Sequence, residues 1–360
     1  MKRLFTLLAI VAVAGLTLSC GGNDEKKKND GAVENVDDGV VENVDDGAVK
    51  KADAPIRQGY NTPLYGDVES ITIREYELED KFGKVVKGEM EYCAKYTFNQ
   101  RGDVVEYTVY DSGLSLNGKG LCKYDSAGNK IEGAWYNSSG RLKSMGLYKY
   151  DSAGNIIEYA DYNSDGSLEG KHLYKYDSAG NKIEEAWYNS DGSLKRKWLY
   201  KYDSAGNMIE EAHYNSDRRL QRKVLYDSAG NMIEKADYNS DGSLDRKNLY
   251  KYDSAGNMIE EAYYYSDGSL GWKRLYKYDS AGNMIEEVSY FSDGRLSSKE
   301  LYKYDSAGNK IEEAEYNSDG SLNWKRLYKY DSAGNIIENT YYKGEIMEPK
   351  YITEYEIVYR

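Results

Sequence analysis

The sequence predicts an all-β protein: an elongated, twisted or curled antiparallel β-meander of 26-residue, two-strand repeats that follows a disordered N-terminal tether. Three observations lead to this prediction. The motif YDSAGN occurs nine times, at a spacing of 26 residues apart from one step of 24. Each repeat alternates two turn motifs with two strand-length segments. All three prolines (Pro55, Pro63 and Pro349) lie outside the repeats, as expected for a ladder of hydrogen-bonded strands.

Residues 1–19 have the form of a signal peptide. A basic start precedes an apolar segment from Leu4 to Leu18, which is too short and wrongly flanked for a membrane-spanning helix. The final letters, TLSC, end at Cys20 and resemble a bacterial lipoprotein signal, although Thr17 stands where that family usually has Leu. The resemblance implies acylation of Cys20 and a lipid-anchored protein of the bacterial cell envelope, at the outer membrane or cell surface. The alternative is an ordinary secretory signal with an incidental cysteine.

Residues 20–58 are expected to form an acidic, disordered tether that carries the lipid. They contain an eight-residue acidic repeat, at Gly31–Asp38 and Gly39–Asp46, and no aromatic residue. Such a composition buries too little apolar surface to order itself. The membrane, through the acyl chains on Cys20, is therefore the first expected partner.

The folded body is expected to have two caps around the repeats. Residues 59–98 form an N-terminal β cap, residues 99–341 the repeat array and residues 342–360 the C-terminal capping strands. Since an open sheet exposes unpaired backbone groups at its edge, we expect Lys350, Glu354 and Glu356 to protect a terminal edge.

Within each repeat, DSAG and NSDG predict type I turns closed by a glycine, as in DSAG at Asp177–Gly180. The strand Leu194–Tyr202 alternates, which places Leu194, Arg196, Trp198, Tyr200 and Tyr202 on one face and Lys195, Lys197, Leu199 and Lys201 on the other. In the shorter strand, we expect a bulge at Glu184–Glu185, so that Ile183, Ala186 and Tyr188 share a face.

The one 24-residue spacing between YDSAGN motifs supports the assignment of these segments as β-strands. The segment Val224–Asn231 lacks two residues that other copies have. Losing two residues leaves every side chain on its face, whereas losing one would invert them.

The motif YxYDxxGN, at Tyr200, Tyr202, Asp203, Gly206 and Asn207, resembles the YD or RHS-type repeats of bacterial surface and toxin-delivery proteins. That resemblance covers about residues 99–335 and implies a long sheet that curls. The unit here is longer, the array is short for a closed shell, and no toxin-like domain follows. The resemblance therefore supports the architecture and not a toxin cage. The segment Gly271–Met284 is also similar to aromatic cell-wall-binding repeats.

Catalysis, cofactors and metals find little support. The two histidines, His172 and His213, occupy different slots of different repeats, and no nucleophilic set or phosphate loop is present. Residues Asp161–Leu168 copy the first half of an EF-hand loop, but its closing Glu is missing. A net charge of −13 disfavours nucleic acid as a partner. Cys93 and Cys122 either pair or fill apolar strand positions. We expect a protein that is not an enzyme, with no cofactor and no metal.

Function is expected at the slots that vary between copies, typified by Trp187, Arg196 and Trp198. Aromatic side chains beside Lys and Arg suit a glycan or a protein ligand. The candidate ligand-binding residues are Trp135, Trp187, Trp198, Tyr263, Trp272 and Trp324. The leading hypothesis is a lipoprotein whose β-repeats serve adhesion, ligand binding or a structural scaffold. The alternative is a carbohydrate-binding repeat protein of the cell-wall or glucan type.

Overall fold

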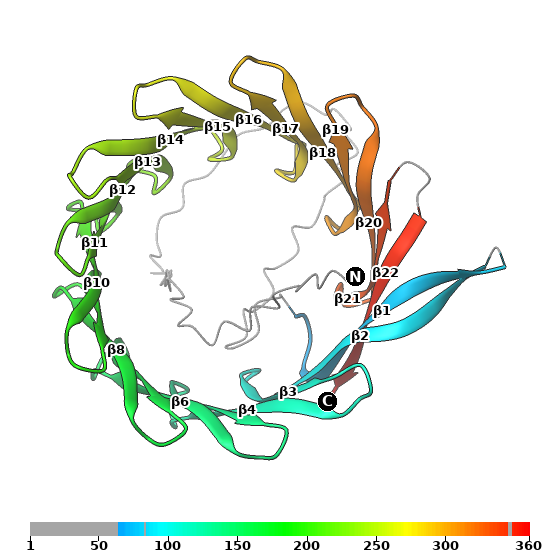
Figure 1. Cartoon of the computed structure of the whole chain (residues 1–360), viewed down its shortest axis with the longest axis horizontal. Helices are drawn as coiled ribbons and strands as arrows, with labels where there is room; N and C mark the ends of the chain where they lie inside the picture. The colour runs from blue at the N-terminus through cyan, green and yellow to red at the C-terminus, as the bar shows by residue number, and fades with distance from the viewer. Residues whose placement is uncertain (1–63, 83, 345–347) are drawn as a thin grey trace, which may run out of the picture. The chain divides into compact units, whose positions relative to one another are not determined.

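A computed structural model describes residues 64–82, 84–344 and 348–360, and every regular element among them is a β-strand (Figure 1). The predicted signal peptide, the lipid site at Cys20 and the tether lie outside these residues. No helix of the described residues has the length and apolar character needed to cross a membrane. The all-β prediction is confirmed.

Twenty-two strands follow one another along the chain. They are β1 Val68–Lys81, β2 Lys84–Phe98, β3 Val104–Tyr110, β4 Leu116–Tyr124, β5 Lys130–Asn137, β6 Leu142–Tyr150, β7 Ile156–Asn163, β8 Leu168–Tyr176, β9 Lys182–Asn189, β10 Leu194–Tyr202, β11 Met208–Asn215, β12 Leu220–Tyr226, β13 Met232–Tyr238, β14 Leu244–Tyr252, β15 Met258–Tyr265, β16 Leu270–Tyr278, β17 Met284–Phe291, β18 Leu296–Tyr304, β19 Lys310–Asn317, β20 Leu322–Tyr330, β21 Ile336–Lys343 and β22 Glu348–Tyr359.

Each strand pairs antiparallel with the next, and β22 pairs with β1 to close the sheet into a ring (Figure 1). The closing register places Ile71 opposite Ile357. The expected curling is confirmed, but the prediction of an elongated, open meander is wrong. The expected terminal edge is wrong for the same reason: β22 is hydrogen-bonded on both sides, and Glu354 and Glu356 form ion pairs with Lys87 and Arg74 of the N-terminal hairpin. Closure removes the edges that an open sheet must protect.

The DSAGN turns have the predicted geometry. In one of them the Asp177 carboxylate accepts the backbone N–H groups of Ala179 and Asn181, both at 2.9 Å, and the Asn181 side-chain amide at 3.0 Å. Gly180 has φ +86°, a conformation that side chains disfavour. Asp, Asn and Gly are therefore each required by the turn itself.

The tyrosine before each Asp joins one repeat to the previous one. The Tyr202 hydroxyl donates to the carbonyl of Lys182, 20 residues earlier, at 2.8 Å. Eight repeats make this bond, at 2.6–2.8 Å. In the shortened repeat, Tyr226 donates to Glu211 instead. A phenylalanine lacks this donor, which explains why tyrosine fills the slot.

The predicted alternation of the long strand is confirmed from Arg196 onward. Trp198 pairs with His213 and Tyr200 with Glu211 on one face, while Leu199 pairs with Ala212 on the other. Leu194 was assigned to the wrong face. It pairs with Tyr188, whereas Arg196 pairs with Trp187, and these two neighbouring residues of β9 point to opposite faces. A register shift at Lys195 causes this change.

The bulge predicted at Glu184–Glu185 is also wrong. Tyr176 pairs with Lys182 and Lys175 with Glu184, so the extra residue is Ile183, next to the turn. Glu184 and Glu185 therefore point to opposite faces. The deletion argument is confirmed: Leu225 of the short strand β12 pairs with Glu210 as Leu199 of β10 pairs with Glu184.

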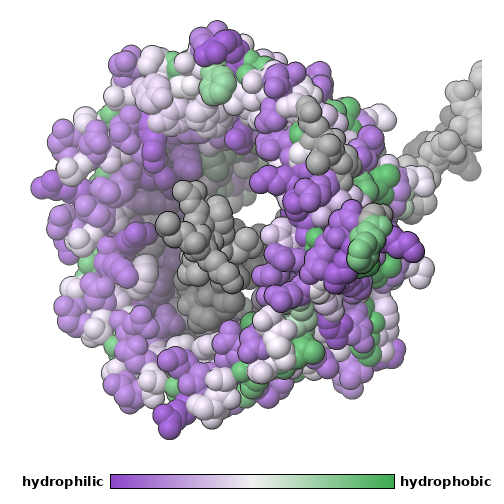
Figure 2. Space-filling model, turned by 45° about the vertical axis from the view of Figure 1, so that its right-hand side comes forward, coloured by the Kyte–Doolittle hydropathy of each residue, from purple (hydrophilic) through white to green (hydrophobic). Residues whose placement is uncertain are grey.

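The face that carries Tyr200 lines the inside of the ring. The segment Leu64–Asp67, drawn in blue before β1, runs inside the ring in Figure 1. Leu64 is buried in a core cluster with Phe98 and Val104, against which Tyr96 and Tyr107 pack from β2 and β3. We call the face of Tyr107 and Tyr200 the inner face, and the face of Lys197 and Leu199 the outer face. Figure 2 shows a largely hydrophilic exterior around a hollow centre.

The last DSAGN turn, between β20 and β21, holds the closing seam together. Asn335 is 1% exposed, and its side-chain oxygen accepts the N–H of Tyr65 at 2.6 Å. Its amide nitrogen donates to the Tyr65 carbonyl at 2.9 Å and to the Tyr359 hydroxyl at 2.7 Å. Beside it, Arg360 bonds to Asp67. Asn335 therefore ties the residues before β1 to the end of β22.

Replacing Asn335 by Ala is expected to loosen this seam. Loss of buried hydrogen bonds should lower the free energy of unfolding by about 1–3 kcal/mol and accelerate amide exchange in β1 and β22. The control, Asn283→Ala, removes the equivalent side chain in the turn between β16 and β17, away from the seam, and should leave exchange in β1 and β22 unchanged. Equal acceleration by both variants would show that Asn335 has no special role.

Candidate functional site

The six predicted ligand-binding residues all lie on the inner face. The register pairs Trp187 with Arg196 and with His172, Trp198 with His213, and Tyr263 with Trp272. Trp135 pairs with Ser144, and Trp324 with Glu315. All six are half-buried in the wall of the ring. A sequence prediction based on variation between copies therefore selected one surface of the molecule.

The inner face is where the copies differ. Two cross-strand slots face each other there and hold the pairs Trp135–Ser144, Asp161–Gly170, Trp187–Arg196, His213–Arg222, Asp237–Arg246, Tyr263–Trp272, Ser289–Ser298 and Glu315–Trp324. No two of these eight pairs are the same. The inner wall thus presents a different chemical group at each repeat.

The outer face is nearly uniform. Glu184 forms ion pairs with Lys175 at 3.0 Å and Lys197 at 2.8 Å. The same Lys–Glu–Lys arrangement recurs at Glu210, Glu260, Glu286 and Glu312. The flanking lysines lower the pKa of Glu210. Exposed pairs contribute little stability individually, so this ladder mainly provides solubility and a constant scaffold.

The six candidates do not form one site. Trp187 stacks on His172, with ring centroids 5.0 Å apart, and Lys195 lies 3.6 Å above its ring. Trp324 donates to Glu315 at 2.9 Å. Tyr263 and Trp272 are the one pair of the six whose rings touch in the described part of the chain, with parallel planes and centroids 5.7 Å apart.

Both histidines belong to carboxylate networks of the inner wall. Glu185 is 2% exposed and contacts Lys182 at 3.0 Å and His172 at 3.4 Å. Burial opposes the charged form of Glu185, but the hydrogen bonds and charges of His172 and Lys182 outweigh it, so its pKa is lowered. His213 contacts Glu211 at 2.6 Å. Each histidine is therefore held by a carboxylate.

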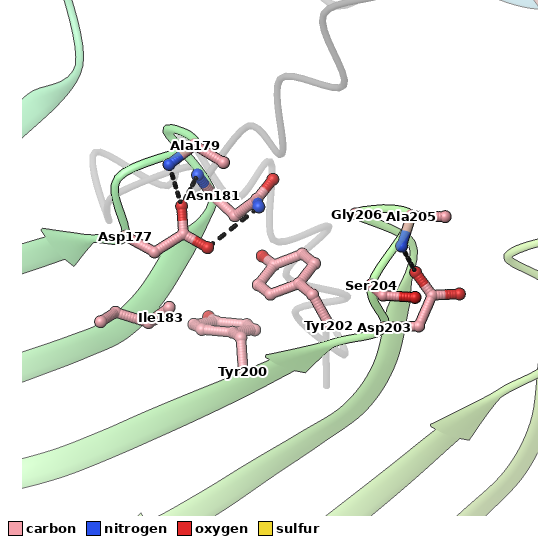
Figure 3. A pocket seen from close by; sticks show the side chains of 10 residues that line it. All are labelled: Asp177, Ala179, Asn181, Ile183, Tyr200, Tyr202, Asp203, Ser204, Ala205 and Gly206. Carbon is pink, nitrogen blue, oxygen red and sulfur yellow. Dashed lines mark hydrogen bonds between the residues drawn. The ribbon is translucent and has the colours of Figure 1, made fainter.

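A pocket of about 380 Å³ opens between two successive turns (Figure 3). Its walls include Ile183, Tyr200 and Tyr202, with Asp177 and Asn181 of one turn and Ala205 of the next. The Asp177 and Asn181 side chains already bond to each other, and the lining combines polar groups with the apolar surface of Ile183 and the two tyrosines. Ile183 is 37% exposed, and its counterparts in most copies are 37–39% exposed. The alternation rule missed these isoleucines because a bulge places them there.

Among the described residues, no group of three or more His, Cys, Asp or Glu side chains has the geometry to hold a metal ion. Cys93 and Cys122 are free thiols on β2 and β4, so the disulfide alternative is not realised. Burial raises the pKa of the Cys93 thiol.

Sequence reasoning also missed two aromatic residues. Tyr265 and Phe291 end β15 and β17 on the inner face, where they replace the Asn of the NSDG turn. Both rings are half exposed. The sequence does contain a signal for them: these two turns read YSDG and FSDG, where other copies read NSDG.

No family model matches this sequence, and a comparison with characterised proteins finds no similar sequence. Among solved structures, the chain is similar to TcdB2-TccC3 without its hypervariable C-terminal region, with 13% identity and a TM-score of 0.39 over 74% of this chain and 16% of that chain. A porin-like protein from Bacteroides uniformis is 9% identical, with a TM-score of 0.30 over 82% of this chain and 99% of that chain. The Photorhabdus luminescens Tc holotoxin pore is 11% identical, with a TM-score of 0.22 over 73% and 19%. All three likenesses are remote, and none identifies a ligand, partner or activity for this chain.

Two carboxylates in the same inner slot should respond oppositely to substitution. The pKa of Glu185 is lowered, so its stabilising charge is present above its unfolded pKa and is lost as pH falls through the folded value. Glu287 has a raised pKa, mainly because burial disfavours its charge, so its ionisation destabilises the fold above the folded value.

We therefore expect Glu185→Gln to lower the free energy of unfolding at pH 7 by about 1–3 kcal/mol, and Glu287→Gln to raise it. Both differences should shrink as the pH falls: the Glu287→Gln difference towards the unfolded pKa, and the Glu185→Gln difference only as the pH falls through the lowered folded pKa of Glu185. Urea unfolding at pH 7 and at a series of lower pH values measures this. A change of the same sign in both variants at pH 7 would contradict the assignment.

Proposed function

We propose that this chain is a non-enzymatic, lipid-anchored protein of the bacterial cell envelope that binds a ligand on the inner wall of its closed sheet. One observation carries the proposal: the copies vary on the inner face and are nearly constant on the outer face. In a repeat array, constant positions build the scaffold. Variable positions that share one concave surface are well placed for recognition.

The composition of that surface supports binding more than catalysis. The variable slots present Trp, Tyr, Arg, Asp and Glu, which provide apolar contact area and hydrogen bonds. The histidines and inner carboxylates described above are engaged with one another. A scaffold without a ligand would gain nothing from eight different residue pairs at one structural position.

A carbohydrate ligand is the second candidate, favoured by the aromatic residues of the inner wall. Five of the six candidate residues are tryptophans, and their rings offer flat apolar surfaces beside polar groups. The outer membrane or cell surface remains the proposed location, on the basis of the N-terminal signal and Cys20.

The lipid anchor is tested by metabolic labelling. Radiolabelled palmitate should enter the wild-type protein and be absent from Cys20→Ala, because Cys20 is the proposed attachment site. Cys93→Ala is the matched control and should label normally. Equal labelling of the wild type and Cys20→Ala would refute the anchor.

Ligand binding inside the ring is tested with two adjacent residues of β18. Ser298 pairs with Ser289 on the inner face, and Lys299 pairs with Val288 on the outer face. In a chain whose native cysteines are replaced, a cysteine at either position is coupled to a polyethylene glycol maleimide. Binding to arrays of glycans and peptides should be lost with the Ser298→Cys conjugate and kept with the Lys299→Cys conjugate. Loss with the outer conjugate alone, or no binding by the unlabelled chain, would contradict the proposal.

A further inference from the structure

The repeat departs from its own pattern at two neighbouring turns. In the usual copy the turn-opening residue is Asn, whose side-chain amide bonds within the turn, as Asn189 does to Ser193 at 2.9 Å. Tyr265 and Phe291 replace it in successive copies and are 50% and 47% exposed. The backbone bonds of both turns are kept. Replacing Asn by Tyr or Phe therefore removes a side-chain hydrogen bond of the turn and adds exposed aromatic surface.

These two rings extend an aromatic cluster on the inner face. Tyr263 and Trp272 lie in parallel planes, 4° apart, with centroids at 5.7 Å. Tyr265 meets the Tyr263 ring edge-on at 5.2 Å. Phe291 is the cross-strand partner of Trp272. We call Tyr263, Tyr265, Trp272 and Phe291 the aromatic platform; it spans β15, β16 and β17.

A glycine makes room for the platform. The residue at this position in an earlier copy is Lys195, whose ammonium lies 3.6 Å above the Trp187 ring. Here the position is Gly271, and a Cβ would lie 2.4 Å from Cδ1 of Tyr263 and 3.1 Å from Cε2 of Tyr265. Such contacts are too short to be tolerated without moving the rings. Gly271 therefore lets both rings occupy that space, without the lysine that covers Trp187. The other two platform rings each have a guanidinium over them: Arg274 lies 5.2 Å from the centroid of Trp272, and Arg295 lies 5.8 Å from that of Phe291.

The charges around the platform disfavour an acidic ligand. Arg246 is paired with Asp237 at 2.8 Å, Arg274 with Glu287 at 3.1 Å and Arg295 with Asp293 at 2.6 Å. Each neighbouring guanidinium is thus engaged by a carboxylate, and the chain carries a net charge of −13. An anion would have to compete with these carboxylates for the guanidinium groups.

We propose that the aromatic platform binds the pyranose rings of a neutral, β-linked glycan. Pyranoses with equatorial substituents present flat faces of C–H groups, which pack on aromatic rings, while their hydroxyls bond to polar groups at the rim. The exposed rings of Tyr265 and Phe291, which lie at neighbouring turns, suit consecutive sugar units of a linear chain, with the stacked Tyr263 and Trp272 rings between them. This inference rests on the proposed function and specifies its ligand class and its site.

The test uses the full mature chain with cellohexaose and chitohexaose as probes, in isothermal titration calorimetry. At least one probe should bind, and Trp272→Ala should weaken its affinity at least tenfold. Tyr264→Ala is the matched control, because Tyr264 lies between Tyr263 and Tyr265 on β15 but pairs with Lys247 on the outer face. It should leave the affinity within twofold of the wild type.

Two further variants separate the platform from folding. The double variant Tyr265→Asn, Phe291→Asn restores the turn residue of the other copies, so the fold should be kept while affinity falls. Gly271→Lys keeps all four aromatic residues and introduces the residue found at Lys195, so it should weaken binding by displacing or covering Tyr263. Circular dichroism and thermal unfolding confirm that both variants fold.

The outcomes distinguish this inference from the proposed function. Loss of binding in the platform variants, with Tyr264→Ala unaffected, supports it. If both probes fail to bind while a peptide or acidic glycan binds inside the ring, the platform assignment is overturned and the proposed function stands. The same holds if a probe binds equally to the wild type and Trp272→Ala. If no ligand binds the inner wall, both are overturned.

Discussion

The backbone hydrogen bonds between β1 and β22 are the constraint on which the rest of the structure depends. A curled sheet of 22 strands that stopped short of closure would leave two unpaired edges, each a template for aggregation. Pairing β1 with β22 removes both and gives every strand two neighbours. The N-terminal hairpin and the last strand are therefore not caps that shield ends but the pieces that join them. Asn335, in the turn before β21, secures this join through the backbone of Tyr65.

Closure also gives the two faces of the sheet different roles. Side chains on the convex face diverge into solvent, where one Lys–Glu–Lys arrangement can recur without conflict. Side chains on the concave face converge, and space there is limited. Glycines on that face accommodate large rings: a Cβ at Gly120 would lie 1.9 Å from Tyr107, and one at Gly118 would lie 2.2 Å from Trp135. A large ring on one strand is thus accommodated by a glycine on the neighbouring strand. This pairing allows the inner wall to vary while the outer ladder stays constant.

Much of the local structure could be predicted from the sequence because it depends on neighbouring residues. The DSAGN turn is determined by the side chains of Asp and Asn and by glycine at positive φ. Alternation placed Arg196 and Trp198 together on one face, and the structure shows that this face is the inner one. The bulge was predicted at Glu184–Glu185 but lies at Ile183, next to the turn. The residues after either position alternate between the two faces in the same way, so the sequence pattern does not show which residue is the extra one. Closure could not be predicted, since it depends on the pairing of residues such as Ile71 and Ile357, which lie almost the whole folded chain apart. Of the candidate site, the surface was found from variation between copies, whereas Tyr265 and Phe291 were missed because turn positions were assumed to be structural.

Residues that depart from the repeat consensus fall into two classes: those that stabilise the fold and those that do not. Asn335 differs from its counterparts because its amide reaches Tyr65 and Tyr359, so that departure serves closure. The two-residue deletion before Asp227 redirects Tyr226 to Glu211, and the turn is kept. Tyr265, Gly271 and Phe291 fall in a different class. They give up turn hydrogen bonds and strand propensity, leave two rings half exposed, and lie together on the surface where copies differ. A change that costs the fold and creates exposed apolar surface on a concave wall is best explained by something that covers that surface.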